Sequence, residues 1–161
     1  MLFRSRELTL DGLYERSKSY WPEEASGASD DYRKHVLGLI QERLKYLAEI
    51  PELTRFFFVD LPVDGALITE HKQLKKVEQS ELKTLLEQAR TSLEASDFTG
   101  QDLTDRLNRL LEATGQKPAV LFSLVRIATT QAPASPGLAE SLALLGKERS
   151  LSRIDQQLAS L

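Results

Sequence analysis

The chain has 161 residues, a formal net charge of −3 and a pI near 5.5. This acidic balance argues against a protein that grips nucleic acid over its whole surface, because non-specific binding needs many Lys and Arg contacts to phosphate. It leaves room for a local basic face. The hydrophobic share of 41% and the charged share of 28% are ordinary for a globular protein of one domain or two small ones.

The sequence also argues against metal, disulfide and membrane chemistry. It has no cysteine, which excludes disulfides, thiolate metal sites and a cysteine nucleophile. His35 and His71 lie far apart with no ligand spacing around either, so we expect no metal site. No apolar run approaches the roughly 18 residues of a membrane helix. The charged start, MLFRSRELTL, does not resemble a signal peptide. We therefore expect a cytoplasmic protein that spans no membrane.

The first half of the chain predicts two main helices. Thr9 is placed to cap a helix over 10–20, and either Asp30 or Asp31 is placed to cap a longer one. Apolar residues at steps of three and four predict that the longer helix runs to Pro51. These residues are Val36, Leu39, Ile40, Leu44 and Leu47. Basic groups on the opposite side, among them Arg43, would face an anionic partner.

A boundary follows this pattern. Phe56-Phe57-Phe58 is most simply interpreted as core or as a subdomain interface. The next segment, 59–65 (VDLPVDG), holds turn signals at Pro62 and at Asp64-Gly65. We therefore expect a first helical subdomain over 1–65 and a second over 66–161.

The second half reads as a series of helices with clear start and stop signals. A short helix is expected over 66–76, and another begins at Ser80. Thr99 with Asp102 three residues on resembles a capping box, and Gly115 suits the helix end. Ser135 is placed to cap, and Pro136 to open, a helix that Gly146 closes before a last amphipathic helix over 150–161.

The segment after Pro118, AVLFSLVRIA, is apolar almost all round. It predicts a buried central helix, and a fully buried strand is the alternative for so short a run. Helical neighbours on both sides favour the helix. No stretch alternates cleanly as a strand. The sequence therefore predicts an all-α fold of about seven to eight helices in two packed sub-bundles.

No catalytic motif is present. The sequence holds no phosphate-binding glycine loop, no serine–histidine–aspartate order and no HExxH motif. Arg126 is more informative, because an arginine in an apolar helix is costly to bury unpaired. It either pairs with an acid such as Glu140 or reaches out at the helix end, where its planar donors suit phosphates and base edges. Physical reasoning alone leaves these two alternatives open. Lys147, Arg149 and Arg153 form a basic face on the last helices.

An ordered set of motifs carries a family resemblance. L-T-L-D-G-L-Y-E-R comes first, followed by Q-E-R-L-K-Y-L-A-E-I-P-E-L-T-R-F-F-F, L-V-R-I-A and S-P-G-L-A-E-S-L-A-L-L-G-K-E-R-S-L-S-R-I. This series resembles the C-terminal anticodon-binding region of bacterial-type glutamyl-tRNA synthetases over nearly the whole chain. The resemblance implies a helical cage of two subdomains and recognition of the anticodon arm of glutamate tRNA.

The resemblance also implies roles for particular residues. Arg43 matches the family's arginine at the last anticodon letter, and Arg126 matches the arginine near the first letter. Ser135, Pro136 and Leu138 match the loop that packs against the anticodon bases. Lys147, Arg149 and Arg153 are weaker candidates for phosphate contacts. One departure affects the loop: Thr130-Gln131 stand where many members have Thr-Gly, which stiffens the segment.

The catalytic domain of these synthetases has no counterpart in this chain. The resemblance therefore implies an anticodon-binding fragment of an ATP-dependent glutamate–tRNA ligase that does not itself ligate glutamate. The fragment would need no cofactor, whereas the full-length enzyme would use ATP and Mg. Its partners would be tRNA and the catalytic domain of the same synthetase, without DNA. The alternatives are a helical protein-interaction module and a stand-alone tRNA-binding regulator without ligase activity.

Overall fold

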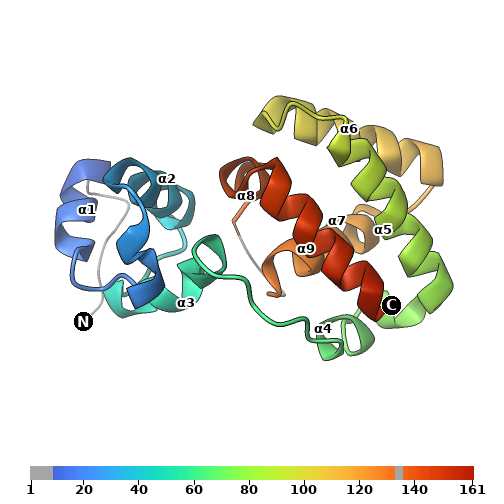
Figure 1. The fold of residues 1–161 in the computed structure, drawn as a ribbon, viewed down its shortest axis with the longest axis horizontal. Helices are drawn as coiled ribbons and strands as arrows, with labels where there is room; N and C mark the ends of the chain where they lie inside the picture. Colours follow the sequence, from blue (N-terminus) through green and yellow to red (C-terminus); the bar gives the residue numbers. More distant parts are fainter. Residues whose placement is uncertain (1–8, 133–135) are drawn as a thin grey trace. The chain divides into compact units, whose positions relative to one another are not determined.

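The computed structural model describes residues 9–132 and 136–161 and divides the chain between Asp60 and Leu61. We call these parts the first unit and the second unit (Figure 1). The all-α prediction is confirmed. Within the described ranges the chain forms nine α-helices, joined by short 3-10 helices, and no strand. Two of the nine, α3 and α4, have only five and four residues, so the number of longer helices agrees with the prediction.

Hydroxyl side chains cap the two longer helices of the first unit. Its α-helices are α1 (Leu10–Ser17), α2 (Asp30–Ile40) and α3 (Ile50–Thr54). Thr9 caps α1 as predicted, since its hydroxyl accepts from the Gly12 amide at 3.1 Å. The predicted cap of α2 is wrong by one position: the Ser29 hydroxyl accepts from the Tyr32 amide, and the two aspartates after it lie in the first turn. There their charge complements the positive end of the helix dipole.

The predicted helix from Asp31 to Pro51 is not continuous. It ends at Ile40, and a turn over 41–46 leads to a 3-10 helix, η3 (Leu47–Glu49), and then to α3. Gly38 weakens the last turn of α2, because glycine costs roughly 1 kcal/mol relative to alanine within a helix. Pro51 occupies the first turn of α3, where its missing N–H costs nothing, so it starts a helix instead of stopping one.

The predicted apolar stripe contributes only in part to the core of the first unit. Val36, Ile40 and Leu44 are buried, whereas Leu39 and Leu47 are half-buried, and Leu37 is buried although it was not predicted. Leu37, Ile40 and Leu44 are almost fully buried, together with Leu13 and Ile50. Full burial of such a side chain contributes about 1.5–3 kcal/mol relative to leaving it exposed.

An aromatic group extends this core, and it includes the Phe56–Phe58 run. Phe56 and Phe57 are buried. The Phe58 ring meets Trp21 and Tyr32 edge-on at 5.9 and 5.8 Å. Edge-to-face pairs of this kind add stability beyond the area they bury. The core prediction is thus confirmed for Phe56 and Phe57, whereas Phe58 is half-buried.

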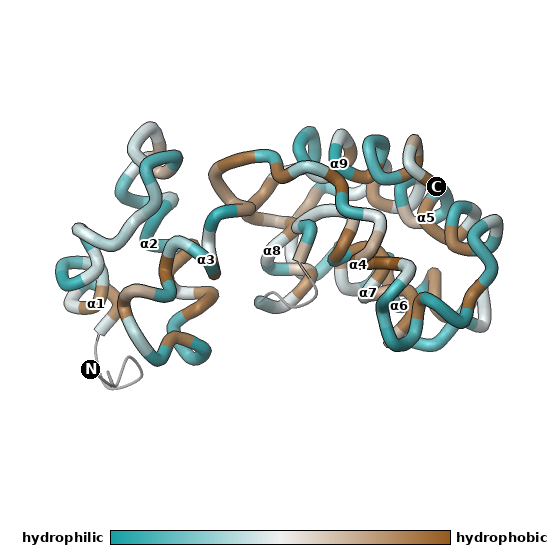
Figure 2. The backbone as a smooth tube through the Cα atoms, turned by 90° about the horizontal axis from the view of Figure 1, so that it is seen from below, coloured by the Kyte–Doolittle hydropathy of each residue, from teal (hydrophilic) through white to brown (hydrophobic). Residues whose placement is uncertain are grey.

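The second unit is a bundle around α7. Its longer helices pack as α5 on α6 and α9, α6 on α8, and α7 on α9 (Figure 1). The α-helices are α4 (Ala66–Thr69), α5 (Gln79–Glu94), α6 (Gly100–Thr114), α7 (Pro118–Thr130), α8 (Leu138–Leu145) and α9 (Lys147–Ser160). Hydrophilic and hydrophobic residues alternate along α9 in Figure 2, as expected of an amphipathic helix.

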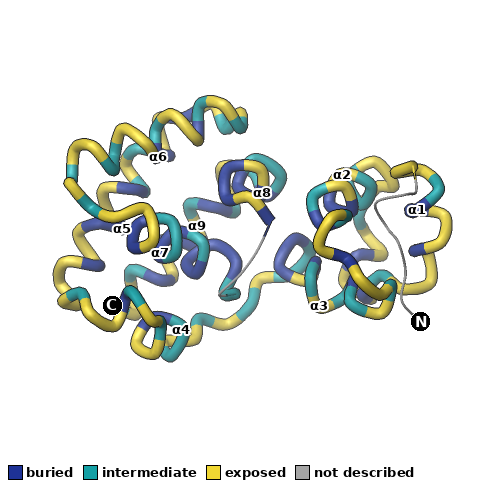
Figure 3. The backbone as a smooth tube through the Cα atoms, turned by 180° about the vertical axis from the view of Figure 1, so that it is seen from behind, coloured by how far each residue is buried: buried dark blue, intermediate teal, exposed yellow. Residues whose placement is uncertain are grey.

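Helix α7 is the buried central helix that its composition predicts, and the strand alternative is wrong. Eight of its residues are buried. Figure 3 shows this contrast: α7 is largely buried, whereas α5 and α6 carry exposed stretches along their outer sides. Pro118 occupies the first turn of α7 as predicted. An apolar helix packed against α4, α5, α6, α8 and α9 removes most of its hydrophobic surface from water.

The expected short helix over 66–76 is broken. Helix α4 ends at Thr69, and a 3-10 turn, η5 (Leu74–Lys76), follows. The His71 Nδ1 atom accepts from the backbone N–H groups of Gln73 and Leu74 at 3.1 and 3.3 Å. An accepting Nδ1 places the proton of the neutral ring on Nε2. His71 is thus a turn-forming residue.

Side chains satisfy the helix ends of the second unit. Thr99 caps α6, as predicted, by accepting from the Asp102 amide. The Asp102 carboxylate does not complete a capping box: it accepts from Ser96 and Arg106. Arg106 also donates to the carbonyls of Ser92 and Ala95 at the end of α5. Together these bonds lower the pKa of Asp102, with the Ser96 hydrogen bond as the largest cause.

Two glycines end helices as predicted. Gly115 follows α6 with φ +69°. Gly146 separates α8 from α9 with φ +89° and ψ 159°, a region that residues with a Cβ rarely enter.

Gly146→Ala should therefore lower the free energy of unfolding by about 1–3 kcal/mol, because the strain has no local relief. Urea unfolding followed by circular dichroism measures this loss. Gly100→Ala is the matched control, since the space around Gly100 is open and its backbone is helical. A loss no larger than that of the control would show that the α8–α9 junction tolerates a side chain.

Candidate nucleic-acid interface

Arg43 lies on the turn that follows α2. The turn is closed by the Ile40 carbonyl, which accepts from the Arg43 and Leu44 amides at 2.9 and 3.0 Å. Leu44 is 3% exposed and anchors the turn in the core, whereas Arg43 is exposed. The five donors of its guanidinium therefore face solvent on a short segment whose neighbour is fixed by burial.

Glu49 holds the second half of the same turn. Its Oε2 atom accepts from the Lys45 amide at 2.9 Å and from the Tyr46 amide at 3.3 Å. These backbone donors would otherwise need water or a continued helix, because the chain leaves α2 before them. We call residues 41–46 the 41–46 turn. Its backbone is thus held from inside the unit while its side chains at 43, 45 and 46 are exposed.

Arg126 occupies a different setting in the second unit. It lies in α7, is half-buried, and lines a hollow of about 240 Å³ between α6, α7 and α8. Leu138, the first residue of α8, lines the same hollow. The structure therefore brings together two of the residues predicted for the anticodon loop.

The walls of this hollow combine two kinds of surface. Leu107, Phe122 and Leu138 supply apolar contact, and Thr104 and Asn108 add polar groups from α6. Arg126 and Glu140 supply charge of opposite sign. A hollow with apolar walls and a few polar groups suits a flat ring with hydrogen-bonding edges.

Glu140 occupies the start of α8. Its carboxylate lies against Gly137, the N-cap residue, so closely that a Cβ at Gly137 would overlap the Oε2 atom. A carboxylate in the first turn of a helix is stabilised by the positive helix end. Arg126 and Glu140 thus share one hollow, and Arg126 is neither fully buried nor fully exposed.

The loop before α8 is described in part. Ser135 lies outside the described residues. The prediction that Ser135 caps this helix and Pro136 opens it is wrong, because the N-cap residue of α8 is Gly137 and the helix begins at Leu138. Pro136 is buried, and its carbonyl accepts from the Ser141 hydroxyl at 3.5 Å. Leu138 is 7% exposed. The part of the loop that enters α8 is therefore packed against the second unit.

The predicted basic face on the last helices needs correction. Lys147 is exposed, and its Nζ donates to the Ser96 carbonyl at 3.3 Å. Arg149 is half-buried and donates to the Leu145 carbonyl. Arg153, however, is only 6% exposed, and its Nη1 donates to the Thr129 carbonyl at 2.7 Å. The Arg153 side chain lies inside the second unit, and its hydrogen bond joins α9 to the last turn of α7. Arg153 therefore does not belong to an exposed basic face.

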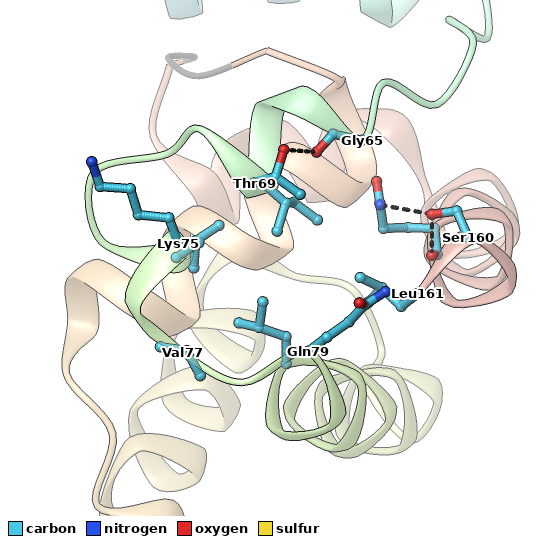
Figure 4. A pocket seen from close by; sticks show the side chains of 11 residues that line it. Gly65, Thr69, Lys75, Val77, Gln79, Ser160 and Leu161 are labelled. Carbon is cyan, nitrogen blue, oxygen red and sulfur yellow. Dashed lines mark hydrogen bonds between the residues drawn. The ribbon is translucent and has the colours of Figure 1, made fainter.

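A second hollow, of about 190 Å³, lies near the C-terminal end of α9 (Figure 4). Thr69, Lys75, Gln79 and Ser160 are among its polar lining residues, and Ile68 and Leu82 among the apolar ones. The Thr69 hydroxyl donates to the Gly65 carbonyl at 3.2 Å. None of the residues predicted for nucleic-acid contact lines this hollow.

Sequence reasoning missed several residues of these sites. Thr104 and Asn108 line the Arg126 hollow from α6, where they resemble ordinary exposed residues. The role of Glu49 in the 41–46 turn was also not predicted, because no Ser or Thr precedes it by three residues to mark a capping box. Within the described ranges, no group of three or more acidic or histidine side chains could hold a metal ion. The same ranges contain no helix long and apolar enough to cross a bilayer.

Comparison with known proteins identifies the class. Residues 12–158 match the family described as anticodon binding domain. The chain therefore belongs to the anticodon-binding domain family.

The relatives are more specific. The chain is 33% identical over 150 residues to the glutamate–tRNA ligase of Bacillus licheniformis and 34% identical over 164 residues to that of Chloroflexus aurantiacus. These alignments cover 92% and 97% of this chain but only 29% and 32% of the relatives. The chain thus spans less than a third of their length. The resemblance to the anticodon-binding region of glutamyl-tRNA synthetases is confirmed.

Solved structures agree on the fold. A glutamate tRNA ligase from Elizabethkingia meningosepticum, crystallised with its amino acid, superimposes with a TM-score of 0.82 over 98% of this chain and 30% of that chain. A glutamate–tRNA synthetase from Elizabethkingia anophelis gives a TM-score of 0.71. Sequence identity is 20% and 18%, so these structures support the fold alone.

The buried position of Arg153 generates a prediction. Arg153→Ala should lower the free energy of unfolding by roughly 1.5–3 kcal/mol, because it leaves the buried Thr129 carbonyl without its charged donor. Thermal or urea unfolding measures this. Gln156→Ala, an exposed position on the same helix, is the control. If Arg153→Ala were as stable as the control but bound nucleic acid less well, the buried role would be wrong.

Proposed function

We propose that this chain is the anticodon-binding part of a glutamate–tRNA ligase and recognises the anticodon arm of glutamate tRNA. The observation that carries the proposal is the position of Arg43, whose guanidinium is exposed on a turn with a fixed backbone. The family to which the chain belongs supports it, as do the names of its relatives.

Recognition at Arg43 would use the edge of a base. Bases in an RNA loop can be turned out of the stack and hydrogen-bonded on their edges. A guanidinium offers paired, coplanar donors that match two acceptors on such an edge. A good bidentate contact separates a right base from a wrong one by about 1–3 kcal/mol, on the scale established for DNA. We assign the last anticodon letter to Arg43.

A second contact would form in the other unit. We assign the base near the first anticodon letter to Arg126, with Ser135, Pro136 and Leu138 as the loop that packs against the anticodon. The hollow between α6, α7 and α8 supports this assignment, because Arg126 and Leu138 line it together. Its apolar walls would hold the face of the base, and Arg126 would meet its edge.

Ligation itself would belong to the catalytic domain of the same synthetase. We therefore assign ATP, Mg and the aminoacylation step to that domain, and no cofactor to this chain. The partners would be glutamate tRNA and the catalytic domain, without DNA, in the cytoplasm. A stand-alone regulator that binds tRNA without ligating it would use the same interface.

A protein-interaction module is less well supported. Such a module needs a continuous exposed apolar surface. Among the described residues, the exposed large hydrophobic side chains are Leu10, Tyr20 and Tyr46. These are single residues and do not form a continuous apolar surface.

The assignment of Arg43 is tested by binding. Arg43→Ala should weaken binding to glutamate tRNA by roughly 5- to 100-fold, and it should abolish the preference over the same tRNA with its third anticodon letter changed. Arg43→Lys should recover little, because lysine lacks the planar fork. Fluorescence anisotropy with labelled tRNA measures these affinities.

Arg16→Ala removes an exposed arginine of α1 and serves as the charge-matched control. The circular dichroism spectrum should be the same for all variants. Equal binding of both tRNAs by the unmodified chain would contradict anticodon reading by this domain alone.

The dependence of the binding constant on salt concentration tests the proposed phosphate contacts. The logarithm of the binding constant should fall with the logarithm of salt concentration by roughly 0.7 for each phosphate contacted. Lys147→Ala should reduce this slope by about 0.7, whereas Lys83→Ala, at an exposed position on α5, should leave it unchanged. A flat salt response of the unmodified chain would rule out a phosphate-binding face.

A further inference from the structure

Tyr46 differs from the other aromatic residues of the first unit. It is 42% exposed. Tyr14, Trp21, Tyr32 and Phe58 contact one another in a ring cluster, and Phe56 packs on Phe57. Tyr46 belongs to neither group. About two-fifths of its side chain therefore faces water, and the ring is available to a flat partner.

The backbone beneath this ring is held in place. The Tyr46 amide donates to Glu49, and its carbonyl accepts from the Glu49 amide at 3.1 Å. Two residues earlier, Leu44 is buried in the core. Tyr46 itself is extended, with φ −134° and ψ 141°, and the helical turn η3 begins at the next residue. A side chain presented from a fixed backbone loses little entropy when it binds, so the position is preorganised.

The neighbours of Tyr46 indicate the chemistry of the partner. Arg43 and Lys45 are exposed on the same 41–46 turn. Of the two carboxylates in this stretch, Glu49 accepts from the backbone and Glu42 takes part in another interaction. An exposed aromatic ring on the same turn as a guanidinium fork and an ammonium group matches a nucleotide, whose base offers a flat face and an edge and whose phosphate carries the negative charge.

We infer that Tyr46 is a stacking surface for a base of the anticodon loop, next to the base whose edge Arg43 reads. Lys45 would neutralise a phosphate of the same nucleotides, and Glu49 would act as a positioning residue for the turn. This inference rests on the proposed function, because it names the contact that gives affinity at the same site.

Stacking and edge reading have different signatures. Every base has an aromatic face, so stacking contributes affinity with little regard to sequence. Hydrogen bonding to an edge depends on which base is present. Loss of the Tyr46 ring should therefore weaken binding to the matched and the altered anticodon by the same factor, whereas loss of Arg43 should remove the difference between them.

The experiment measures binding of an anticodon stem–loop RNA from glutamate tRNA, and of the same RNA with its third anticodon letter changed. Tyr46→Ala should weaken binding to both by roughly 5- to 100-fold. Tyr46→Phe keeps the ring and should bind like the unmodified chain. Tyr20→Ala removes a ring of nearly the same exposure, 39%, from a different segment and is the matched control.

A spectroscopic arm tests stacking directly. Tyr46→Trp should show quenched indole emission when the RNA binds, whereas Tyr20→Trp should not. If Tyr46→Ala binds both RNAs like the control, the stacking role is wrong while the proposed function stands. If Tyr46→Phe loses as much affinity as Tyr46→Ala, the hydroxyl and not the ring makes the contact, and the inference is overturned. If the unmodified chain binds neither RNA, the proposed function and the inference both fail.

Discussion

Backbone groups at helix ends are the main constraint on this structure. A chain of many short helices has many N–H and C=O groups without intrahelical partners, and each costs free energy if it is buried unsatisfied. Side chains from elsewhere in the same unit supply the missing partners. Glu49 serves the turn after α2, Arg106 the end of α5 and Arg153 the end of α7. The positions of the helices follow from these bonds as much as from the core.

The same constraint decides which charged residues are available to a ligand. The guanidinium groups of Arg106 and Arg153 donate to carbonyls of neighbouring helices, so these two residues stabilise the fold. Among the described residues, the Arg43 side chain donates to no helix-end carbonyl, and the Ile40 carbonyl beside it accepts from two backbone amides. Arginines of equal charge thus differ in their availability to a ligand, because some donate to a nearby helix end and others do not. A count of basic residues along the sequence cannot show this difference.

Local patterns predict most of the fold. The caps at Thr9 and Thr99, the glycine ends at Gly115 and Gly146, and the buried α7 all depend on neighbours in sequence, so they could be inferred without the structure. The break in the long predicted helix could not be inferred from the sequence. It depends on Glu49 reaching back to the 45 and 46 amides, and on a proline that starts α3.

The sites divide in the same way. Arg126 could be singled out as a charge within an apolar helix, but the roles predicted for Arg43 and Arg126 depend on the family resemblance, because the spacing of single arginines carries no functional signal. The hollow around Arg126 could not be predicted, since Thr104 and Asn108 reach it through the packing of α6 on α8. Arg153 was misjudged for a related reason: its position on the face of α9 that meets α7 is a property of the bundle and not of the α9 sequence.

The single tryptophan of the chain lies in the first unit. The Trp21 ring contacts Tyr14 and Phe58, and its Nε1 donates to the Ser17 hydroxyl at 3.0 Å. Its fluorescence therefore reports on the first unit alone, whereas the longest helices, and most of the far-ultraviolet dichroism, belong to the second. The molecule thus carries separate natural reporters for its two halves, and comparing their melting curves distinguishes one cooperative folding unit from two.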